Sequence, residues 1–250
     1  MTVLGGPTAL LEIAGLRLLT DPTFDAPGRY PTGSRLEKTT PPAWTAEQVG
    51  ELDAVLLSHD QHPDNLDISG RELLRTAPVV LTTPLAAGRL DSNAIALSAW
   101  EEVELVGSGG QVLTVTGVPA RHGPEGCEPV TGPVTGFVLS GEDLPTLYVS
   151  GDNASLDHVQ AIAERCGPVD VALLFAGAAR TALFDGANLT LTSDEAAEAA
   201  RILGARRAVL VHVEGWAHFT EGPATLPAAF ERAGILDRLT MPTPGTPTRP

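Results

Sequence analysis

The stretch from residue 54 to residue 67 reads Ala-Val-Leu-Leu-Ser-His-Asp-Gln-His-Pro-Asp-Asn-Leu-Asp. Its first four residues form a short, bounded apolar run, which predicts a buried strand. Pro63 disfavours a regular helix in the part that follows, so we expect a loop at the end of the strand. A loop in that place allows a rigid sheet to direct His59, His62 and Asp64 into one site.

The polar half of this stretch has the composition of a metal site. Two imidazoles and three carboxylates lie within the nine residues 59–67. Neutral imidazole is a common metal ligand, and a carboxylate adds the negative charge that a divalent cation needs. A polar turn with solvated side chains is the alternative, and it would be favoured for a single histidine. The density of ligand types here favours the metal site.

Polar side chains follow three further predicted strands in the same way. They are His122 after the strand 111–118, Asp152 after 146–149 and His212 after 207–211. Five of the six histidines lie in three strand-end clusters, and only His158 lies on a predicted helix. A random distribution would seldom give this pattern. Clustering alone therefore predicts a metal site, before any family is considered.

The loop also resembles the metal-binding loop of the metallo-β-lactamase fold superfamily, whose pattern is His-x-His-x-Asp-His after a buried strand. His62 and Asp64 match this pattern best, and His59 matches its first histidine if the loop carries one extra residue. Gln61 or Asn65, depending on the direction of counting, then stands where the family has a histidine. Asn65 replaces the histidine that usually binds the second metal.

The resemblance extends from the first predicted hairpin to the last histidine cluster. It places His122 at the third metal-binding histidine, Asp152 at a carboxylate that bridges two metals and His212 at the final metal-binding histidine. It also implies that Asp21, in a Thr-Asp-Pro sequence at the end of the hairpin, supports the metal loop. His218 is expected to contact the substrate, to support the site from behind, or to pack beside Trp216.

The fold implied by the resemblance is an α/β (α+β) four-layer αββα sandwich. Two mixed β-sheets are expected face to face, with helices outside and metals at one edge. We expect one such domain over residues 1–240, followed by a Pro/Thr-rich tail, 241–250, that frays. Length and hydrophobic content, 250 residues and 43%, suit a single core of this kind.

The predicted reaction is metal-dependent hydrolysis of a small ester, lactone or phosphodiester by a metal-bound hydroxide. Asp64 would orient the hydroxide or take its proton, and His218 is the second catalytic candidate. One or two divalent ions are expected, two being favoured. Zinc is the first choice, and extra oxygen ligands from Asp60 and Asp64 would favour manganese or iron. Within the superfamily the layout loosely resembles the branch of ascorbate-6-phosphate lactonase and N-acylphosphatidylethanolamine phospholipase D.

Two functions of other classes remain open. The altered positions Gln61 and Asn65 would suit a non-catalytic binding protein that has lost its metal. A di-iron redox protein could use the same fold, and colour and iron content would distinguish it from a zinc hydrolase. Neither a Gly-x-Ser-x-Gly nucleophile elbow nor a Walker-type phosphate loop occurs in the sequence, which argues against two other enzyme classes.

Composition limits the partners. The formal net charge of −15 disfavours nucleic acid, so a small-molecule substrate is expected. No apolar run reaches the roughly 18 residues of a membrane span, and no signal peptide is recognised at the start, so we expect a cytoplasmic protein. Cys127 and Cys166 are expected as free thiols, and an oligomer remains open.

The remaining segments predict the surroundings of the site. A hairpin is expected over residues 8–20, a β-meander over 94–118, and helices over 45–51, 69–76, 155–166, 192–203 and 224–233. The long loops 24–45 and 176–189 are expected to wall the substrate cleft. Arg180 could hold an anionic substrate group there, although a simple surface charge is the alternative.

Overall fold

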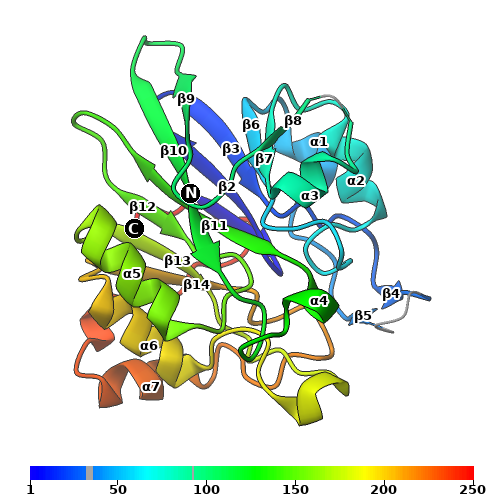
Figure 1. The fold of residues 1–250 in the computed structure, drawn as a ribbon, viewed down its shortest axis with the longest axis vertical. Coiled ribbons are helices and arrows are strands. Elements are labelled where there is room, and N and C mark those ends of the chain that lie inside the picture. The colour runs from blue at the N-terminus through cyan, green and yellow to red at the C-terminus, as the bar shows by residue number, and fades with distance from the viewer. Residues whose placement is uncertain (32–35, 92) are drawn as a thin grey trace.

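Two mixed β-sheets face each other in the computed structural model, which describes residues 1–31, 36–91 and 93–250 (Figure 1). The first is six-stranded, in the order β1 (Thr2–Gly5), β2 (Thr8–Ile13), β3 (Leu16–Thr20), β6 (Ala54–Leu56), β7 (Val80–Thr82), β8 (Ala94–Ala96). The second is seven-stranded, in the order β15 (Leu239–Thr240), β14 (Arg207–Val211), β13 (Val171–Phe175), β12 (Leu147–Val149), β11 (Val134–Ser140), β10 (Val112–Ala120), β9 (Glu102–Val106). Each sheet has an antiparallel and a parallel half.

Helices cover the outer faces of both sheets (Figure 1). They are α1 (Ala46–Val49), α2 (Ile68–Leu74), α3 (Pro84–Ala87), α4 (Glu128–Thr131), α5 (Leu156–Cys166), α6 (Ser193–Ile202) and α7 (Leu226–Arg232), with 3₁₀ turns η1 (Leu183–Gly186) and η2 (Leu236–Arg238). The predicted caps are confirmed. Thr45 forms a capping box with Gln48, and the Ser155 side chain accepts from the backbone N–H of His158.

Three apolar clusters fill the spaces between the layers. The central cluster joins the two sheets, with Leu18 and Leu56 from the first and Phe137 and Phe175 from the second. A second cluster packs α5, α6 and α7 on the second sheet, and a third packs α1 and α2 on the first sheet. The order of layers is therefore helix, sheet, sheet, helix, and the predicted αββα sandwich is confirmed.

Strand direction brings the polar loops to one edge of the sandwich. β3 and β6 pair in parallel, so Asp21 and Ser58 follow their ends side by side. β12, β13 and β14 are also parallel, which places the residues after Val149 and Val211 at one edge. β10 and β12 are both antiparallel to β11, and β10 therefore ends at that same edge.

The structure corrects three local expectations. The predicted meander over 94–118 is wrong, because β8 pairs in parallel with β7 in the first sheet and the chain crosses to the second sheet before β9. The loop 24–45 contains a two-stranded ribbon of β4 (Gly28–Arg29) and β5 (Glu37–Lys38), while its residues 32–35 lie outside the described residues. The tail does not fray, since Gly245 and Thr248 donate backbone hydrogen bonds to Val3 and Met1.

Of the helices that the described residues form, none is long and apolar enough to cross a membrane. Both cysteines are free, as expected.

Candidate metal centre

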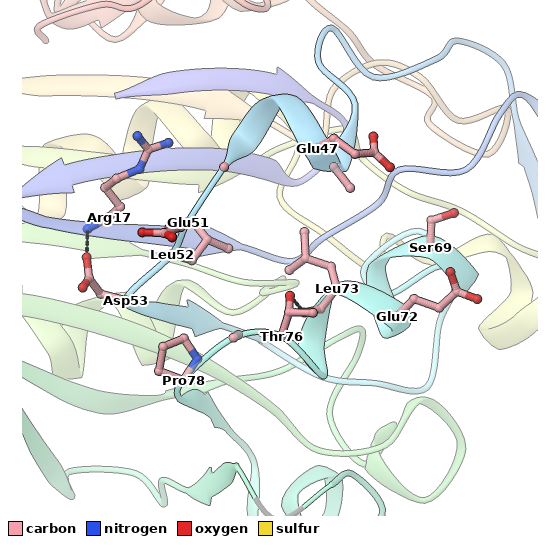
Figure 2. Close-up of a pocket in the computed structure, with 13 residues that line it drawn as sticks. Arg17, Glu47, Glu51, Leu52, Asp53, Ser69, Glu72, Leu73, Thr76 and Pro78 are labelled. Carbon is pink, nitrogen blue, oxygen red and sulfur yellow. Dashed lines mark hydrogen bonds between the residues drawn. The ribbon is translucent and has the colours of Figure 1, made fainter.

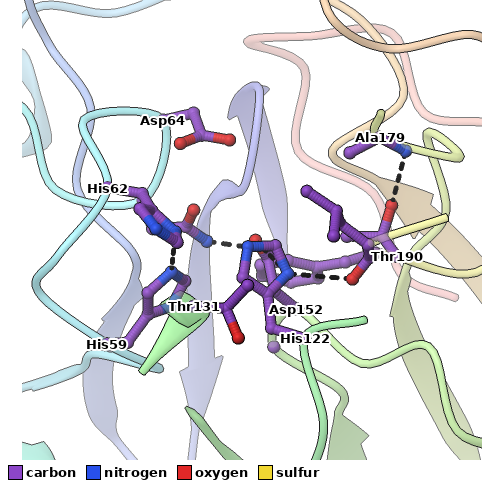
Figure 3. Close-up of polar contacts among 12 residues, drawn as sticks. His59, His62, Asp64, His122, Thr131, Asp152, Ala179 and Thr190 are labelled. Carbon is purple, nitrogen blue, oxygen red and sulfur yellow. Dashed lines mark hydrogen bonds and ion pairs between the residues drawn. The ribbon is translucent and has the colours of Figure 1, made fainter. Parts of the chain in front are cut away.

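Three histidines from two loops converge at the shared edge, and we call His59, His62 and His122 the three-histidine triad. Their ligand atoms all lie within 4.8 Å of one another (Figure 3). Nε2 of His59 lies 2.9 Å from Nδ1 of His62, and the ring centroids are 4.9 to 5.4 Å apart. Rings that share one tetrahedral ion have centroids about 5 Å apart, given metal–nitrogen bonds of about 2.0–2.1 Å. The triad therefore has the geometry of one ion site.

Hydrogen bonds behind the rings set which nitrogen is free. Ser58 Oγ donates to Asp21 Oδ2 at 2.7 Å, so the 2.9 Å contact between Ser58 Oγ and His59 Nδ1 has the histidine as donor. His122 Nδ1 likewise donates to the carbonyl oxygen of Leu189 at 2.8 Å. In both rings the proton resides on Nδ1, and Nε2 keeps its lone pair for a ligand.

Asp21 supports this arrangement from inside the protein. Its side chain is buried, and Oδ1 accepts the backbone N–H of Ser58 at 2.6 Å. Burial raises its pKa to about 7, against the lowering effect of the hydrogen bonds from Ser58 and Asn65. Asp21 itself adopts a left-handed backbone with φ of 27°. The sequence prediction that Asp21 lies behind the metal loop agrees with these contacts.

A second group lies beside the first, and we call Asp64, Asp152 and His212 the mixed triad. Its ligand atoms also lie within 4.8 Å of one another, and all three residues are buried. His212 Nε2 is 3.3 Å from Asp64 Oδ2, and His212 Nδ1 is 3.4 Å from Asp152 Oδ1. Neither contact has hydrogen-bond geometry, and among the described residues both ring nitrogens are without a hydrogen-bond partner.

The backbone at His212 is held in a costly conformation. Its φ of 56° is left-handed, which costs a non-glycine residue on the order of 1–3 kcal/mol. The N–H of His212 donates to the carbonyl oxygen of Gly6 at 2.7 Å, and this bond ties the end of β14 to the turn between β1 and β2. The fold thus maintains strain at the residue that presents an imidazole to the mixed triad.

Electrostatics favour the metal-binding protonation states of His59, His62 and Asp64. Burial, followed by repulsion from neighbouring imidazoles, lowers the pKa of His59 well below its ordinary value and also lowers the pKa of His62. Burial alone would raise the pKa of Asp64, but His218 and His212 outweigh it and hold that pKa well below the usual range. At neutral pH His59 and His62 are therefore neutral and Asp64 is ionised. Burial alone would lower the pKa of His212, but Asp152 and Asp64 outweigh it and raise that pKa.

His218 lies beside the mixed triad without belonging to it. Its Nε2 is 3.0 Å from Asp64 Oδ2, and its side chain is 11% exposed. The ring centroids of His212 and His218 are 6.5 Å apart, more than the roughly 5 Å of rings that share an ion. His218 is thus a hydrogen-bond partner of Asp64. It packs against Phe219 at 4.6 Å and lies 6.3 Å from Trp216.

Three residues that the sequence left ambiguous have other partners. Asn65 Nδ2 donates to Asp21 Oδ2 at 3.1 Å and to Asp152 Oδ1 at 3.2 Å. Gln61 is exposed and lies against Gly132. Asp60 was expected as an extra oxygen ligand, but both of its carboxylate oxygens accept from the Arg89 guanidinium, so the structure pairs it with Arg89 and does not include it in either triad.

Sequence reasoning missed two groups that orient the ligands. The sequence showed Ser58 only as the residue before His59. Its side chain orients His59 through a hydrogen bond to the distant Asp21. The Leu189 carbonyl that holds His122 is a backbone group, 67 residues away in sequence. Such a contact leaves no residue-type signal.

The two loops that were predicted to wall the cleft make contacts near the candidate metal centre. Tyr30, in the loop 24–45, packs against Trp216 with centroids 5.5 Å apart, and its hydroxyl donates to Asp25 at 2.9 Å. The exposed Arg180 donates through Nε to Asn188 Oδ1 at 2.7 Å, and its backbone N–H donates to the carbonyl of His218. An anion-binding role for Arg180 stays a prediction.

A cavity of about 960 Å³ lies elsewhere, between α1 and α2 (Figure 2). Arg17 and Asp53 line it, and their contact, from the Arg17 backbone N–H to the carboxylate, measures 2.7 Å. Several acidic side chains join them, but no member of either triad lines this cavity. It is therefore separate from the candidate metal centre.

Known proteins share both the sequence pattern and the fold. The model of the β-lactamase superfamily domain matches residues 16–213. An N-acyl-phosphatidylethanolamine-hydrolyzing phospholipase D of Caenorhabditis elegans is 26% identical over 225 residues, which cover 84% of this chain and 62% of that enzyme. A UPF0173 metal-dependent hydrolase of Pyrococcus horikoshii is 28% identical over 184 residues, covering 71% and 73% of the two chains.

Among solved structures, the isothiocyanate hydrolase from Delia radicum gut bacteria has a TM-score of 0.81 and 21% identity, covering 98% of this chain and 97% of that one. This likeness shows a common fold. The match to the worm enzyme spans less than two thirds of that enzyme's length.

Proposed function

Because this chain belongs to the β-lactamase superfamily, we propose that it is a metal-dependent hydrolase that uses two divalent ions on a small ester, lactone or phosphodiester. The observation that carries the proposal is the pair of adjacent triads, each with ligand atoms within 4.8 Å of one another. The three-histidine triad would hold the first ion and the mixed triad the second.

Unpartnered polar atoms support the fit to ions. Asp64 Oδ1, Asp152 Oδ2 and both ring nitrogens of His212 are buried, and among the described residues they have no hydrogen-bond partner. Leaving a buried polar atom unpaired costs about 1–3 kcal/mol, and more for a charged group. Bound cations would account for the two carboxylate oxygens and for one nitrogen of His212, because a neutral imidazole has a single lone pair. The donor set of imidazoles and carboxylates suits zinc, with manganese or iron as alternatives.

The side chains then have separate tasks. Divalent ions bound there would lower the pKa of a bound water to about 7 and so supply a nucleophile at neutral pH. Asp64 would orient the attacking group and accept its proton. We assign proton donation to the leaving group to His218, whose Nε2 lies 3.0 Å from Asp64 Oδ2 and whose side chain is partly exposed. Asn65 donates to both Asp21 and Asp152 and would keep these two carboxylates in place.

The choice among substrates rests on the relatives. The worm relative is named for hydrolysis of a phosphodiester lipid, and a two-ion centre can stabilise both the attacking and the leaving oxygen of such a bond. We therefore place a phosphodiester first, with an ester or lactone next. The complete three-histidine triad disfavours the alternative of a non-catalytic protein with a lost metal site, because the changed positions Gln61 and Asn65 lie outside it.

The test is hydrolysis by protein reconstituted with zinc, manganese or iron. Bis(p-nitrophenyl) phosphate, p-nitrophenyl acetate and a γ-lactone cover the three substrate classes. We expect turnover of the phosphodiester that is abolished by a chelator and restored by the ion. Protein that holds two ions and hydrolyses none of the three would contradict the proposed substrate class.

A further inference from the structure

The loop between His59 and His62 brings the two rings together although it is one residue longer than in the family pattern. Two residues, Asp60 and Gln61, separate these histidines, whereas the family pattern has one residue between its first two histidines. The two rings nevertheless meet at 2.9 Å. The additional residue must therefore bulge away from the direct path between the two histidines. Gln61 turns outward, toward Gly132, where a Cβ would lie 2.1 Å from Gln61 Nε2. Asp60 turns inward, and only 4% of its side chain is exposed.

Two arginines hold the inward-turned Asp60. Arg89 donates from Nε to Asp60 Oδ2 at 3.0 Å and from Nη2 to Oδ1, which makes a bidentate pair. Arg71 Nη2 donates to the backbone carbonyl oxygen of Asp60 at 3.1 Å. Arg71 Nη2 also lies 3.9 Å from Asp60 Oδ2, so both arginines face the carboxylate, and Arg71 in addition holds the backbone carbonyl.

These arginines come from elements that the fold places beside the loop. Arg71 lies in α2, directly after the loop, and Arg89 follows α3. β6 and β7 are parallel neighbours, so the loop after β6 and the helix after β7 lie at one edge of the sheet. Sequence spacing alone would not bring Arg89 to Asp60, since 29 residues separate them.

We propose that Arg89 and Arg71 are positioning residues for the three-histidine triad, which hold Asp60 so that His59 and His62 can share one ion; this inference rests on the proposed metal centre. A free carboxylate next to imidazole ligands would compete for a divalent cation. The bidentate guanidinium occupies both oxygens with charge-assisted hydrogen bonds. Asp60 is thereby removed from the ligand set, and its backbone sets the approach of the two rings.

The two possible roles of Asp60 give opposite results when Arg89 is replaced. If Arg89 positions the loop, Arg89→Met weakens binding of the first ion by roughly 10- to 100-fold, the usual loss when support behind a ligand is removed. If Asp60 is a ligand that Arg89 restrains, the same change strengthens binding. Arg89→Lys keeps the charge but loses the fork, and it should give an intermediate loss.

The experiment is a stepwise zinc titration against a chromophoric chelator, with the unfolding temperature of the metal-free protein measured in parallel. Arg75→Met is the matched control, because Arg75 pairs with Asp91 at 3.6 Å with both side chains largely exposed. Asp60→Asn combined with Arg89→Met separates charge balance from position. It removes the carboxylate that Arg71 alone would otherwise have to compensate, so stability should return while first-ion affinity stays low.

Each outcome decides the inference. A selective loss at the first ion in Arg89→Met, absent in Arg75→Met, supports it. Unchanged or tighter zinc binding in Arg89→Met, with two ions still bound by the wild type, overturns the inference and leaves the proposed function standing. A wild type that binds neither zinc nor manganese nor iron overturns both. If Arg89→Met does not fold, Arg89→Lys decides by the same comparison.

Discussion

Asn65 donates a hydrogen bond of 3.2 Å from its amide nitrogen to Oδ1 of Asp152, a residue 87 positions away in the sequence. The same nitrogen donates to Asp21 Oδ2 at 3.1 Å. All three side chains are buried. The residue that replaces a family histidine thus bridges two carboxylates that belong to opposite sheets. Its amide is a structural link between the loop after β6 and the strand end after β12.

Replacing Asn65 by Ala should destabilise the protein. The change removes one donor from each of two buried carboxylates. Asp21 keeps its hydrogen bonds from Ser58, whereas Asp152 Oδ1 loses the hydrogen bond from Asn65, and a buried unsatisfied group costs about 1–3 kcal/mol. We expect urea denaturation to show that the free energy of unfolding of the metal-free protein decreases by about 1–3 kcal/mol. Asn188→Ala, which removes only a bond to the exposed Arg180, is the control and should change it by less than about 0.5 kcal/mol. Equal stability of the two variants would show that the bridge contributes nothing.

Metal content should separate the two triads. Elemental analysis of the wild type is expected to give about two ions per chain. His62→Ala should lose the first ion and His212→Ala the second, because each removes one of three protein ligands. His158→Ala, on α5, is the control and should keep both ions. One ion in the wild type, lost only in His62→Ala, would mean that the mixed triad does not bind metal.

His218 should affect turnover without affecting metal content. Its ring lies too far from that of His212 to share an ion, but within hydrogen-bond distance of Asp64. A general acid typically contributes about 10²- to 10⁴-fold to the rate, so His218→Ala should lower kcat by that factor and keep two ions. The measurement is kcat together with elemental analysis on one sample. If that sample contains a single ion, His218 is a ligand and the assigned role is wrong.

Gly70 should not tolerate a side chain. A Cβ at this position would lie 1.9 Å from the carbonyl oxygen of Pro22, next to Asp21, so α2 would have to move away from the end of β3. Overpacking of this kind typically costs about 1–3 kcal/mol, and we expect Gly70→Ala to lose that much stability in thermal unfolding. At Gly109 a Cβ would meet nothing within 4 Å, so Gly109→Ala is the matched control. Similar melting temperatures would contradict the tight contact between α2 and Pro22.

Much of the architecture could be predicted from the sequence, because local residue patterns indicate where strands and helices begin and end. Apolar runs that end in His or Asp predicted four strand ends, and the caps Thr45 and Ser155 predicted two helix starts. The resemblance of the loop to the metallo-β-lactamase pattern supplied the order of the layers. The family and the two mixed sheets are confirmed. The prediction failed for the pairing of β8, because the partner of a strand depends on how the chain crosses between the sheets and not on local residue type.

Composition and order along the chain were enough to identify the candidate metal ligands, since imidazoles and carboxylates follow the ends of predicted strands. The partners of each ligand became known from the folded protein alone. In the folded protein the ligands form two separate triads, Asp60 pairs with Arg89, and the Asn65 amide donates to Asp21 and Asp152. These choices depend on contacts of about 3 Å between segments far apart in the chain, and only packing of the two sheets brings those segments together.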